Sequence, residues 1–167
     1  MKTVSKTLGA LAVAALAGTY VYGMFSLTEA RANRFLDELE ALSLQGKSTE
    51  YCARLHADLA VSIRDHSATP PADFDGGRDD FCGYVSDAAK GMDLLGISTQ
   101  VTRENFTLTR SALHPWTARV SYHEDRTTTM SKVQATVHTV SDDSLTLVQT
   151  FDGVKLLALK SRVELAP

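Results

Sequence analysis

The chain has 167 residues, of which 44% are hydrophobic and 22% charged, and its formal net charge at pH 7 is −3. These values are typical of one folded domain. Because Lys2 and Lys6 are two of the 17 basic residues, residues 28–167 carry a formal charge of −5. This acidic balance argues against nucleic acid as a partner, since phosphates need concentrated basic side chains.

The N-terminal segment is apolar and begins with the two lysines. Leu8 to Leu27 is a run of twenty residues without a charge. A helix of that length rises about 30 Å, which matches the hydrocarbon core of a bilayer. The run is therefore predicted to be an uncut signal anchor. Two alternatives stay open: a signal peptide cleaved after the small residues Ala15 to Ala17, and a buried helix of a soluble protein.

The anchor interpretation divides the chain into residues 1–27, the leader, and residues 28–167, a single extracytoplasmic domain. The lysines favour a cytoplasmic N-terminus. We therefore expect a single-pass inner-membrane protein with its domain in the periplasm. Cleavage near Ala17 would instead give a secreted or soluble periplasmic protein.

The chain has two cysteines, Cys52 and Cys82. In an exported domain an even number of cysteines favours a disulfide. This bridge would close a loop of about thirty residues and contribute about 3–4 kcal/mol in the chain-entropy model. Two buried free thiols are the alternative, and they would fit a cytosolic protein.

Three helices are predicted after the leader. In the first, Phe35, Leu39 and Leu42 recur at helical spacing, and Gly46 is placed to end it. The second is predicted to start at Ser48 or Thr49 and to present Cys52, Leu55 and Leu59 on one face. Residues 67–80, rich in Pro, Asp and Gly, are predicted to form a loop. The third helix carries an apolar face of Phe81, Val85, Ala88 and Met92.

From residue 97 onward the hydrophobic period changes to two, which predicts strands. Four or five strands are expected, at 97–110, 117–129, 131–140, 144–151 and 154–164. Ser141 to Asp143 is predicted to be a turn, and Asp152-Gly153 a tight hairpin. The break near Met130 is open, because residues 117–140 also fit one long bent strand.

Helices followed by an antiparallel meander define the α+β class. We expect an N-terminal apolar helix, then about three helices packed on a curved, cone-like antiparallel sheet of four to five strands. This order of elements over residues 30–165 resembles the nuclear transport factor 2-like superfamily, which includes ketosteroid isomerases, scytalone dehydratases and polyketide cyclases. The resemblance implies a cone-shaped pocket between sheet and helices. It carries over no catalytic residue, and fold does not convey function.

The densest cluster of polar residues is Tyr122-His123-Glu124-Asp125-Arg126. Strand geometry separates it into two faces, so that only Tyr122, Glu124 and Arg126 share the face that begins apolar. On a concave apolar face Glu124 could be a general base and Tyr122 a hydrogen-bond donor. Alternatively, Arg126 pairs with Glu124 and makes it structural, which is the commoner outcome.

The remaining candidates are weaker. Asp58 and Tyr84 are considered as a base and a donor for the implied pocket, and His56 and Asp58, two apart on a helix, are not expected to face each other. No metal-ligand spacing, phosphate loop or dinucleotide fingerprint occurs, so no metal or cofactor is expected.

Three functions are compatible with these features. The first is a non-catalytic, membrane-tethered domain that binds a partner protein or a small apolar ligand. The second is a small pocket enzyme of the isomerase, dehydratase or cyclase kind, with Glu124 or Asp58 as base and Tyr122 or Tyr84 as donor. The third is a structural module that forms a homodimer.

Overall fold

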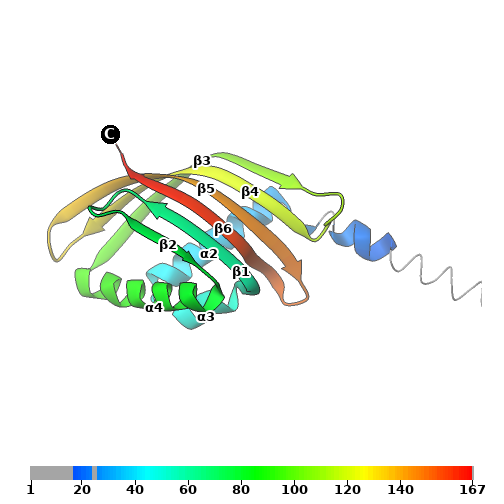
Figure 1. Cartoon of the computed structure of the whole chain (residues 1–167), viewed down its shortest axis with the longest axis horizontal. Helices are drawn as coiled ribbons and strands as arrows, with labels where there is room; N and C mark the ends of the chain where they lie inside the picture. The colour runs from blue at the N-terminus through cyan, green and yellow to red at the C-terminus, as the bar shows by residue number, and fades with distance from the viewer. Residues whose placement is uncertain (1–16, 24–25, 167) are drawn as a thin grey trace, which may run out of the picture.

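The computed structural model describes residues 17–23 and 26–166. Three helices and six strands follow the N-terminal segment, and the chain curls a sheet around the helices (Figure 1). The elements in chain order are α2 (Glu29–Leu44), α3 (Ser48–Ala53), β1 (Leu55–Asp65), β2 (Ala72–Gly76), α4 (Arg78–Leu95), β3 (Ile97–Arg110), β4 (Thr117–Met130), β5 (Ala135–Thr150) and β6 (Gly153–Leu165). The α+β class is confirmed.

Helix α2 confirms the first predicted helix. Thr28 caps it, since its side chain accepts a hydrogen bond from the backbone N–H of Arg31 at 3.2 Å. The helix buries one apolar face, made up of Ala32, Phe35, Leu36 and Leu39. It ends at Leu44, and Gly46 adopts a positive φ of 68° directly after it, as the sequence predicts.

The second predicted helix is too long. Helix α3 ends at Ala53, and Leu55 already begins strand β1. The spacing of Leu55 and Leu59 is misleading because residues four apart share a face in a strand as well as in a helix. Both leucines are buried from β1. The third predicted helix is confirmed as α4.

The sheet has six strands in the order β2-β1-β6-β5-β4-β3. The expected four- to five-stranded antiparallel sheet is therefore too small, and one pair, β1 with β6, is parallel. The two extra strands come from residues 60–67, whose alternation fits either a helix end or a short strand, and from the predicted loop. In particular, the predicted loop 67–80 contains β2, which pairs with β1 from Val61↔Gly76 to Asp65↔Ala72.

The predicted turn at Ser141 to Asp143 does not exist. The chain turns instead at residues 131–134, and β5 runs without a break from Ala135 to Thr150. All fourteen residues of β4 pair with this strand. Two predicted strands are thus one strand, and the Ser-Asp-Asp residues lie in its middle. The strands predicted at 97–110, 117–129 and 154–164 correspond to β3, β4 and β6.

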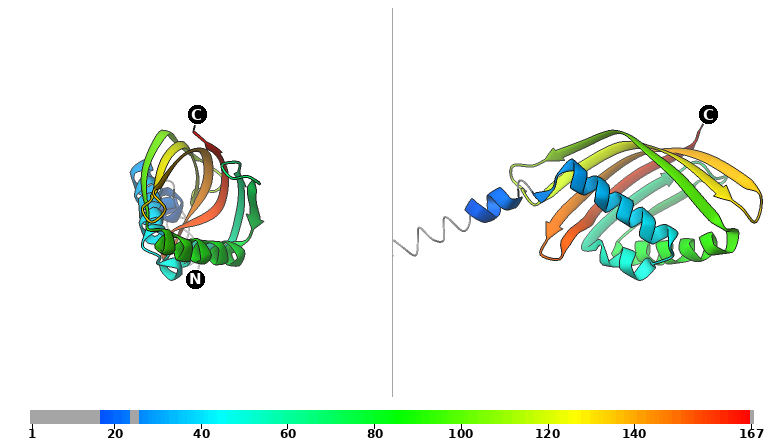
Figure 2. Two further views of the ribbon diagram at one scale, coloured as in Figure 1. Left: turned by 90° about the vertical axis from the view of Figure 1, so that its left-hand side faces the viewer. Right: turned by 180° about the vertical axis from the view of Figure 1, so that it is seen from behind.

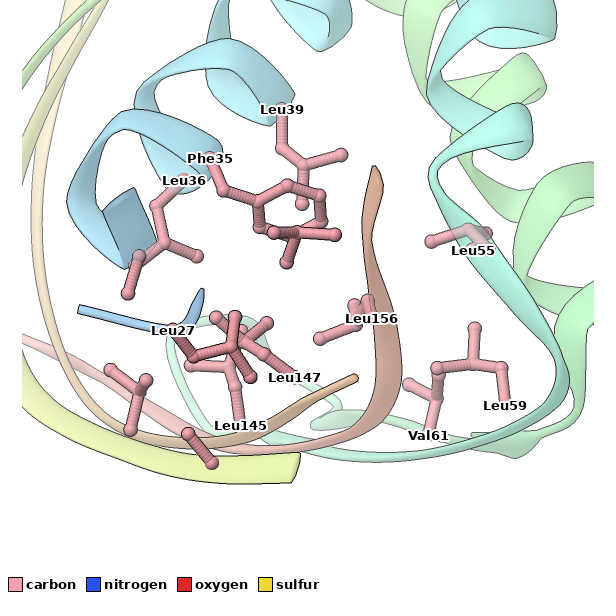
Figure 3. Packing of buried hydrophobic residues seen from close by; sticks show 14 of the residues in the cluster. Leu27, Phe35, Leu36, Leu39, Leu55, Leu59, Val61, Leu145, Leu147 and Leu156 are labelled. Carbon is pink, nitrogen blue, oxygen red and sulfur yellow. The ribbon is translucent and has the colours of Figure 1, made fainter. Parts of the chain in front are cut away.

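The sheet is strongly curved and does not close, and the three helices lie on its concave side (Figure 2). The core fills the space between them at the end where β5 and β6 are joined (Figure 3). Leu27, at the end of the predicted anchor, is fully buried in this core with Phe35, Leu36, Leu145 and Leu147. Burial of one such leucine contributes about 1.5–3 kcal/mol.

The predicted disulfide is present. Cys52 at the end of α3 and Cys82 in the first turn of α4 are bonded, with their Cα atoms 5.7 Å apart. The bridge therefore clamps two helices across the segment that contains β1 and β2.

The predicted anchor, Leu8 to Leu27, lies largely outside the described residues. Residues 17–23 and 26–27 of it are described: residues 17–23 are helical and expose Tyr20, Val21 and Tyr22, whereas Ser26 and Leu27 are buried. Within residues 17–23 and 26–166 no helix is both long and apolar enough to cross a membrane.

Candidate functional site

A cavity of about 430 Å³ opens between the concave face of the sheet and helices α2 and α4. Its inner wall is apolar. Side chains from α2, α4 and the centre of the sheet make up this wall: Leu36, Leu39, Phe81, Val85, Leu145, Leu156 and Leu159. Polar side chains of β4, β5 and β6 make up the opposite part. The cavity therefore combines an apolar body with one polar side.

The pairing register of β4, β5 and β6 brings the polar side chains of the cavity together. Tyr122 of β4 lies directly opposite Asp143 of β5, and Asp143 lies opposite Ser161 of β6. Because directly opposite residues in neighbouring strands place their side chains on the same face, these three line one row of the cavity wall. A second row beside it runs from Arg103 through Glu124 to Ser141.

Glu124 is 5% exposed and fully engaged. Its Oε1 accepts hydrogen bonds from Nε and Nη2 of Arg126 at 3.0 and 2.7 Å, and its Oε2 accepts one from Nε of Arg103 at 3.3 Å. Arg103 also donates to Asp37 at 2.5 Å and to Glu40 at 2.8 Å. This network joins α2 to the sheet. The commoner alternative, a Glu124–Arg126 pair, is therefore what the structure shows.

Asp143 differs from Glu124, since no Lys, Arg or His of the described residues forms an ion pair with it. Its Oδ2 accepts a hydrogen bond from the Ser141 hydroxyl at 3.0 Å. Burial raises the pKa of the Asp143 carboxyl, and the negative charge of Glu124 raises it further. Hydrogen bonds from Ser161 and Ser141 oppose this shift. A partly buried carboxyl with a raised pKa holds its proton to a higher pH than an exposed aspartate does, which suits a group that transfers protons.

Two buried phenols complete the polar side. Burial raises the pKa of Tyr51 to about 12, and burial together with the charge of Asp143 raises that of Tyr122. Both therefore stay protonated and can donate a hydrogen bond at neutral pH. The Tyr122 ring is held between Phe106, with ring centroids 6.0 Å apart, and the Arg103 guanidinium, 5.8 Å from its centroid.

The structure brings some predicted site residues together and separates others. Tyr122, Glu124 and Arg126 all face the cavity, as strand alternation predicts. Tyr84 lies at its rim, half-exposed and stacked on Phe81 with ring centroids 6.1 Å apart. Asp58 lies outside the cavity, and its side chain is 86% exposed.

Asp58 lies on β1 instead of a helix, and the expectation that it would not face His56 is wrong. Residues two apart on a strand share a face. The His56 ring nitrogen Nδ1 accepts a hydrogen bond from the backbone N–H of Asp58 at 3.2 Å. Elsewhere in residues 17–23 and 26–166, no three His, Cys, Asp or Glu side chains are grouped so that they could hold a metal ion.

Sequence reasoning missed Asp143 and Arg103. Asp143 was assigned to a turn because Ser141 to Asp143 resembles turn composition. The signal that could have found it is the alternation of Val137, Thr139, Ser141, Asp143, Leu145 and Leu147, which continues through the supposed turn. Arg103 had no local signal, since its acidic partners on α2 are more than sixty residues away in sequence.

No protein-family model and no curated protein shows significant similarity to this sequence. Solved structures do resemble it. A Novosphingobium aromaticivorans protein provisionally assigned as a scytalone dehydratase superposes with a TM-score of 0.65 at 14% identity, over 81% of this chain and 83% of its own. The β subunit of benzoate 1,2-dioxygenase from Burkholderia mallei also gives 0.65, at 11% identity over 81% and 89%.

An NTF2-like protein with a cystatin-like fold, also from Novosphingobium aromaticivorans, superposes with a TM-score of 0.58 at 14% identity over 80% and 79% of the two chains. The chain thus has the nuclear transport factor 2-like fold, which confirms the resemblance predicted from element order. At these identities the likeness defines the fold and leaves the function to be argued from the cavity.

Proposed function

We propose that the protein is a membrane-tethered, non-catalytic domain whose cavity binds a small, largely apolar molecule that carries a hydrogen-bonding group. The observation that carries this proposal is the cavity itself. Its volume of about 430 Å³ lies within the range of small-molecule sites. Its leucine-rich wall matches an apolar body, and the row of Tyr122, Asp143 and Ser161 matches one polar group.

The charges of the cavity restrict the ligand. The two arginines that reach it, Arg103 and Arg126, are already bound by carboxylates. Asp143 adds a carboxyl without a paired cation. The polar side therefore favours a neutral group or a hydrogen-bond donor over an anion.

The tether rests on the charge-free run Leu8 to Leu27 behind two lysines. A tether would raise the concentration of the domain beside membrane-bound partners or membrane-derived ligands. A protein partner and a homodimer both stay predictions. Light scattering of the purified chain distinguishes the homodimer from the monomer.

Binding is tested with the neutral fluorescent probe N-phenyl-1-naphthylamine, which combines two apolar ring systems with one N–H donor. Val163 lines the cavity, whereas its neighbour Arg162 is exposed on the other face of β6. We expect the probe to brighten with the native chain and with Arg162→Trp, and its affinity to fall at least about tenfold in Val163→Trp, which corresponds to about 1.4 kcal/mol. Equal affinities in the two variants would place the probe elsewhere and reject the cavity as the binding site.

A second candidate function is a pocket enzyme that uses a carboxyl base. One observation favours it: Asp143 is partly buried, has a raised pKa and lies opposite the Tyr122 phenol. Asp143 would take the part first considered for Glu124 and Asp58, because both oxygens of Glu124 are occupied and Asp58 is exposed. The neighbour provisionally assigned as a scytalone dehydratase supports the same direction.

The enzyme candidate is tested by the exchange of α-protons of a cyclic ketone for deuterium, followed by NMR. Asp143→Asn should abolish any exchange that the native chain catalyses, whereas Asp58→Asn should leave it unchanged. Exchange that survives in Asp143→Asn would reject the assignment of the base.

A further inference from the structure

Exposed apolar side chains gather at one end of the molecule. Leu113, in the loop between β3 and β4, is 86% exposed, and Phe151, in the hairpin between β5 and β6, is fully exposed. Tyr20, Val21 and Tyr22 are exposed on the N-terminal helical segment. Figure 1 and the rear view in Figure 2 place both loops and this segment at the same end. Side chains of this kind cost free energy in water unless something covers them.

Two hydrogen bonds and one contact between aromatic rings join these segments. The Tyr20 hydroxyl donates to the backbone carbonyl of Ala112 at 2.8 Å. The backbone N–H of Gln149, at the end of β5, donates to the carbonyl of Trp116 at 2.8 Å. Trp116 also packs on the N-terminal segment, where its ring centroid lies 6.0 Å from that of Tyr22. We call Tyr20, Tyr22, Leu113, Trp116 and Phe151 the apolar end.

The length of the apolar run indicates what covers this end. Gly23 lies so close to the Trp116 ring that an added Cβ would meet it at 3.0 Å, and Leu27 is buried in the core. The charge-free residues before Gly23 are Leu8 to Tyr22, of which Tyr20 and Tyr22 contact the domain at the apolar end. Fifteen residues in a helix would rise about 22 Å, which is shorter than the roughly 30 Å of a bilayer core. Because Gly23 lies against Trp116, a run held in the bilayer would also hold the apolar end at the bilayer surface.

We propose that the apolar end rests in the interface of the lipid bilayer, with Leu113 and Phe151 inserted among the acyl chains. This inference rests on the tether in the proposed function and adds the surface and orientation of docking. Tyr and Trp are the residues that favour the interface, and protruding Leu and Phe are suited to insertion. Insertion of Leu113 and Phe151, the two tips, also reduces the mismatch between the length of the short apolar run and the thickness of the bilayer core.

The charges beside the tips are compatible with this orientation. Asp152, next to Phe151, has a compensating cation in Lys155, with the charged atoms 4.0 Å apart. In this orientation the turn at residues 131–134, at the opposite end of β4, points away from the bilayer (Figure 1). Its exposed Val133 provides a matched control position.

The chain contains one tryptophan, Trp116, which makes the test direct. The full chain with its leader is reconstituted into phosphatidylcholine vesicles, recovered by flotation, and compared in vesicles with and without brominated acyl chains. We expect the chain to float with the vesicles and the brominated lipid to quench Trp116. The double variant Leu113→Asp with Phe151→Asp should float but lose most of the quenching, whereas Val133→Asp should behave as the native chain.

A second control moves the fluorophore. In Trp116→Phe combined with Val133→Trp, brominated lipid should leave the emission unchanged. A floating chain whose Trp116 is not quenched would overturn the docking inference and leave the tether intact. Equal quenching in the Leu113/Phe151 double variant would overturn insertion by these tips. A chain that does not float would overturn both the tether and the docking that rests on it.

Discussion

Tyr122 and Asp143 lie directly opposite each other on β4 and β5, with both side chains in the cavity. Burial raises the pKa of both groups, and the charge of Asp143 raises that of Tyr122 further. The pair therefore offers a permanent donor beside a carboxyl that keeps its proton to a higher pH than an exposed one does. This is the feature of the cavity that most restricts what it can bind or transform.

The first prediction concerns the pH dependence of stability. The folded-state pKa of Asp143 is raised above 3.8, so the folded protein holds this proton at pH values at which the unfolded chain releases it. The contribution of Asp143 to stability is therefore full below the unfolded pKa and is lost as pH rises through the folded pKa. Asp143→Asn removes this loss. Its stability relative to the native chain should rise as pH increases above the unfolded pKa of about 3.9, measured by urea unfolding.

Asp125→Asn is the matched control for this experiment, since Asp125 is exposed on the other face of β4. Its stability relative to the native chain should change little over the same range. A constant difference between Asp143→Asn and the native chain would mean that Asp143 is not buried in the folded protein.

The second prediction concerns the arginine network. Arg103→Met leaves the buried Glu124 with one cation and removes the cation that holds Glu40 and Asp37. Loss of one partner from a buried ionic network costs about 3–5 kcal/mol, and Arg103 is only partly exposed to solvent screening. Urea unfolding should show this loss. Arg103→Lys should recover only part of it, because an ammonium group cannot contact three carboxylates in fixed directions.

An exposed pair provides the comparison. Arg162 and Glu164 form a surface ion pair at 2.8 Å on β6. Arg162→Met should cost less than about 1 kcal/mol, as exposed pairs usually do. Comparable losses in Arg103→Met and Arg162→Met would contradict the central position of Arg103.

The sequence predicted local structure correctly where the hydrophobic periodicity agrees with the residues that begin or end a helix or strand. The apolar face of α2, the glycine that ends it and the alternation of β4 were all readable, and so was the cavity-facing set of Tyr122, Glu124 and Arg126. The failures have physical causes. Leu55 and Leu59 fit a helix because residues four apart share a face in both a helix and a strand, and the Ser-Asp-Asp of β5 has turn composition although neighbouring strands hold it extended.

Contacts between residues that are distant in the chain could not be predicted from local sequence patterns. The parallel pairing of β1 with β6 joins residues about a hundred positions apart, and no local pattern indicates it. The same is true of Arg103, whose role depends on how α2 crosses β3. Asp143 was the most consequential error, since its wrong assignment to a turn removed from consideration a cavity carboxyl that lies opposite Tyr122.

The third prediction concerns the disulfide. Cys52 and Cys82 are thirty residues apart, so their bridge should contribute about 3–4 kcal/mol by restricting the unfolded chain. A reductant should lower the urea midpoint of the native chain to that of the Cys52→Ser, Cys82→Ser double variant. The double variant itself should not respond to the reductant. An unchanged midpoint of the native chain, with both thiols alkylated, would contradict this contribution.

The last prediction concerns the start of the domain. Leu27 belongs to the core, and its carbonyl accepts hydrogen bonds from Nε and Nη2 of Arg110 at 2.9 and 2.5 Å. Leu27→Ala leaves the hydrogen bonds and removes the buried side chain, which should cost about 2–5 kcal/mol. The exposed Val21 is the control, since Val21→Ala should change stability by less than about 0.5 kcal/mol. Equal effects of the two variants in urea unfolding would place Leu27 outside the core and the domain boundary after it.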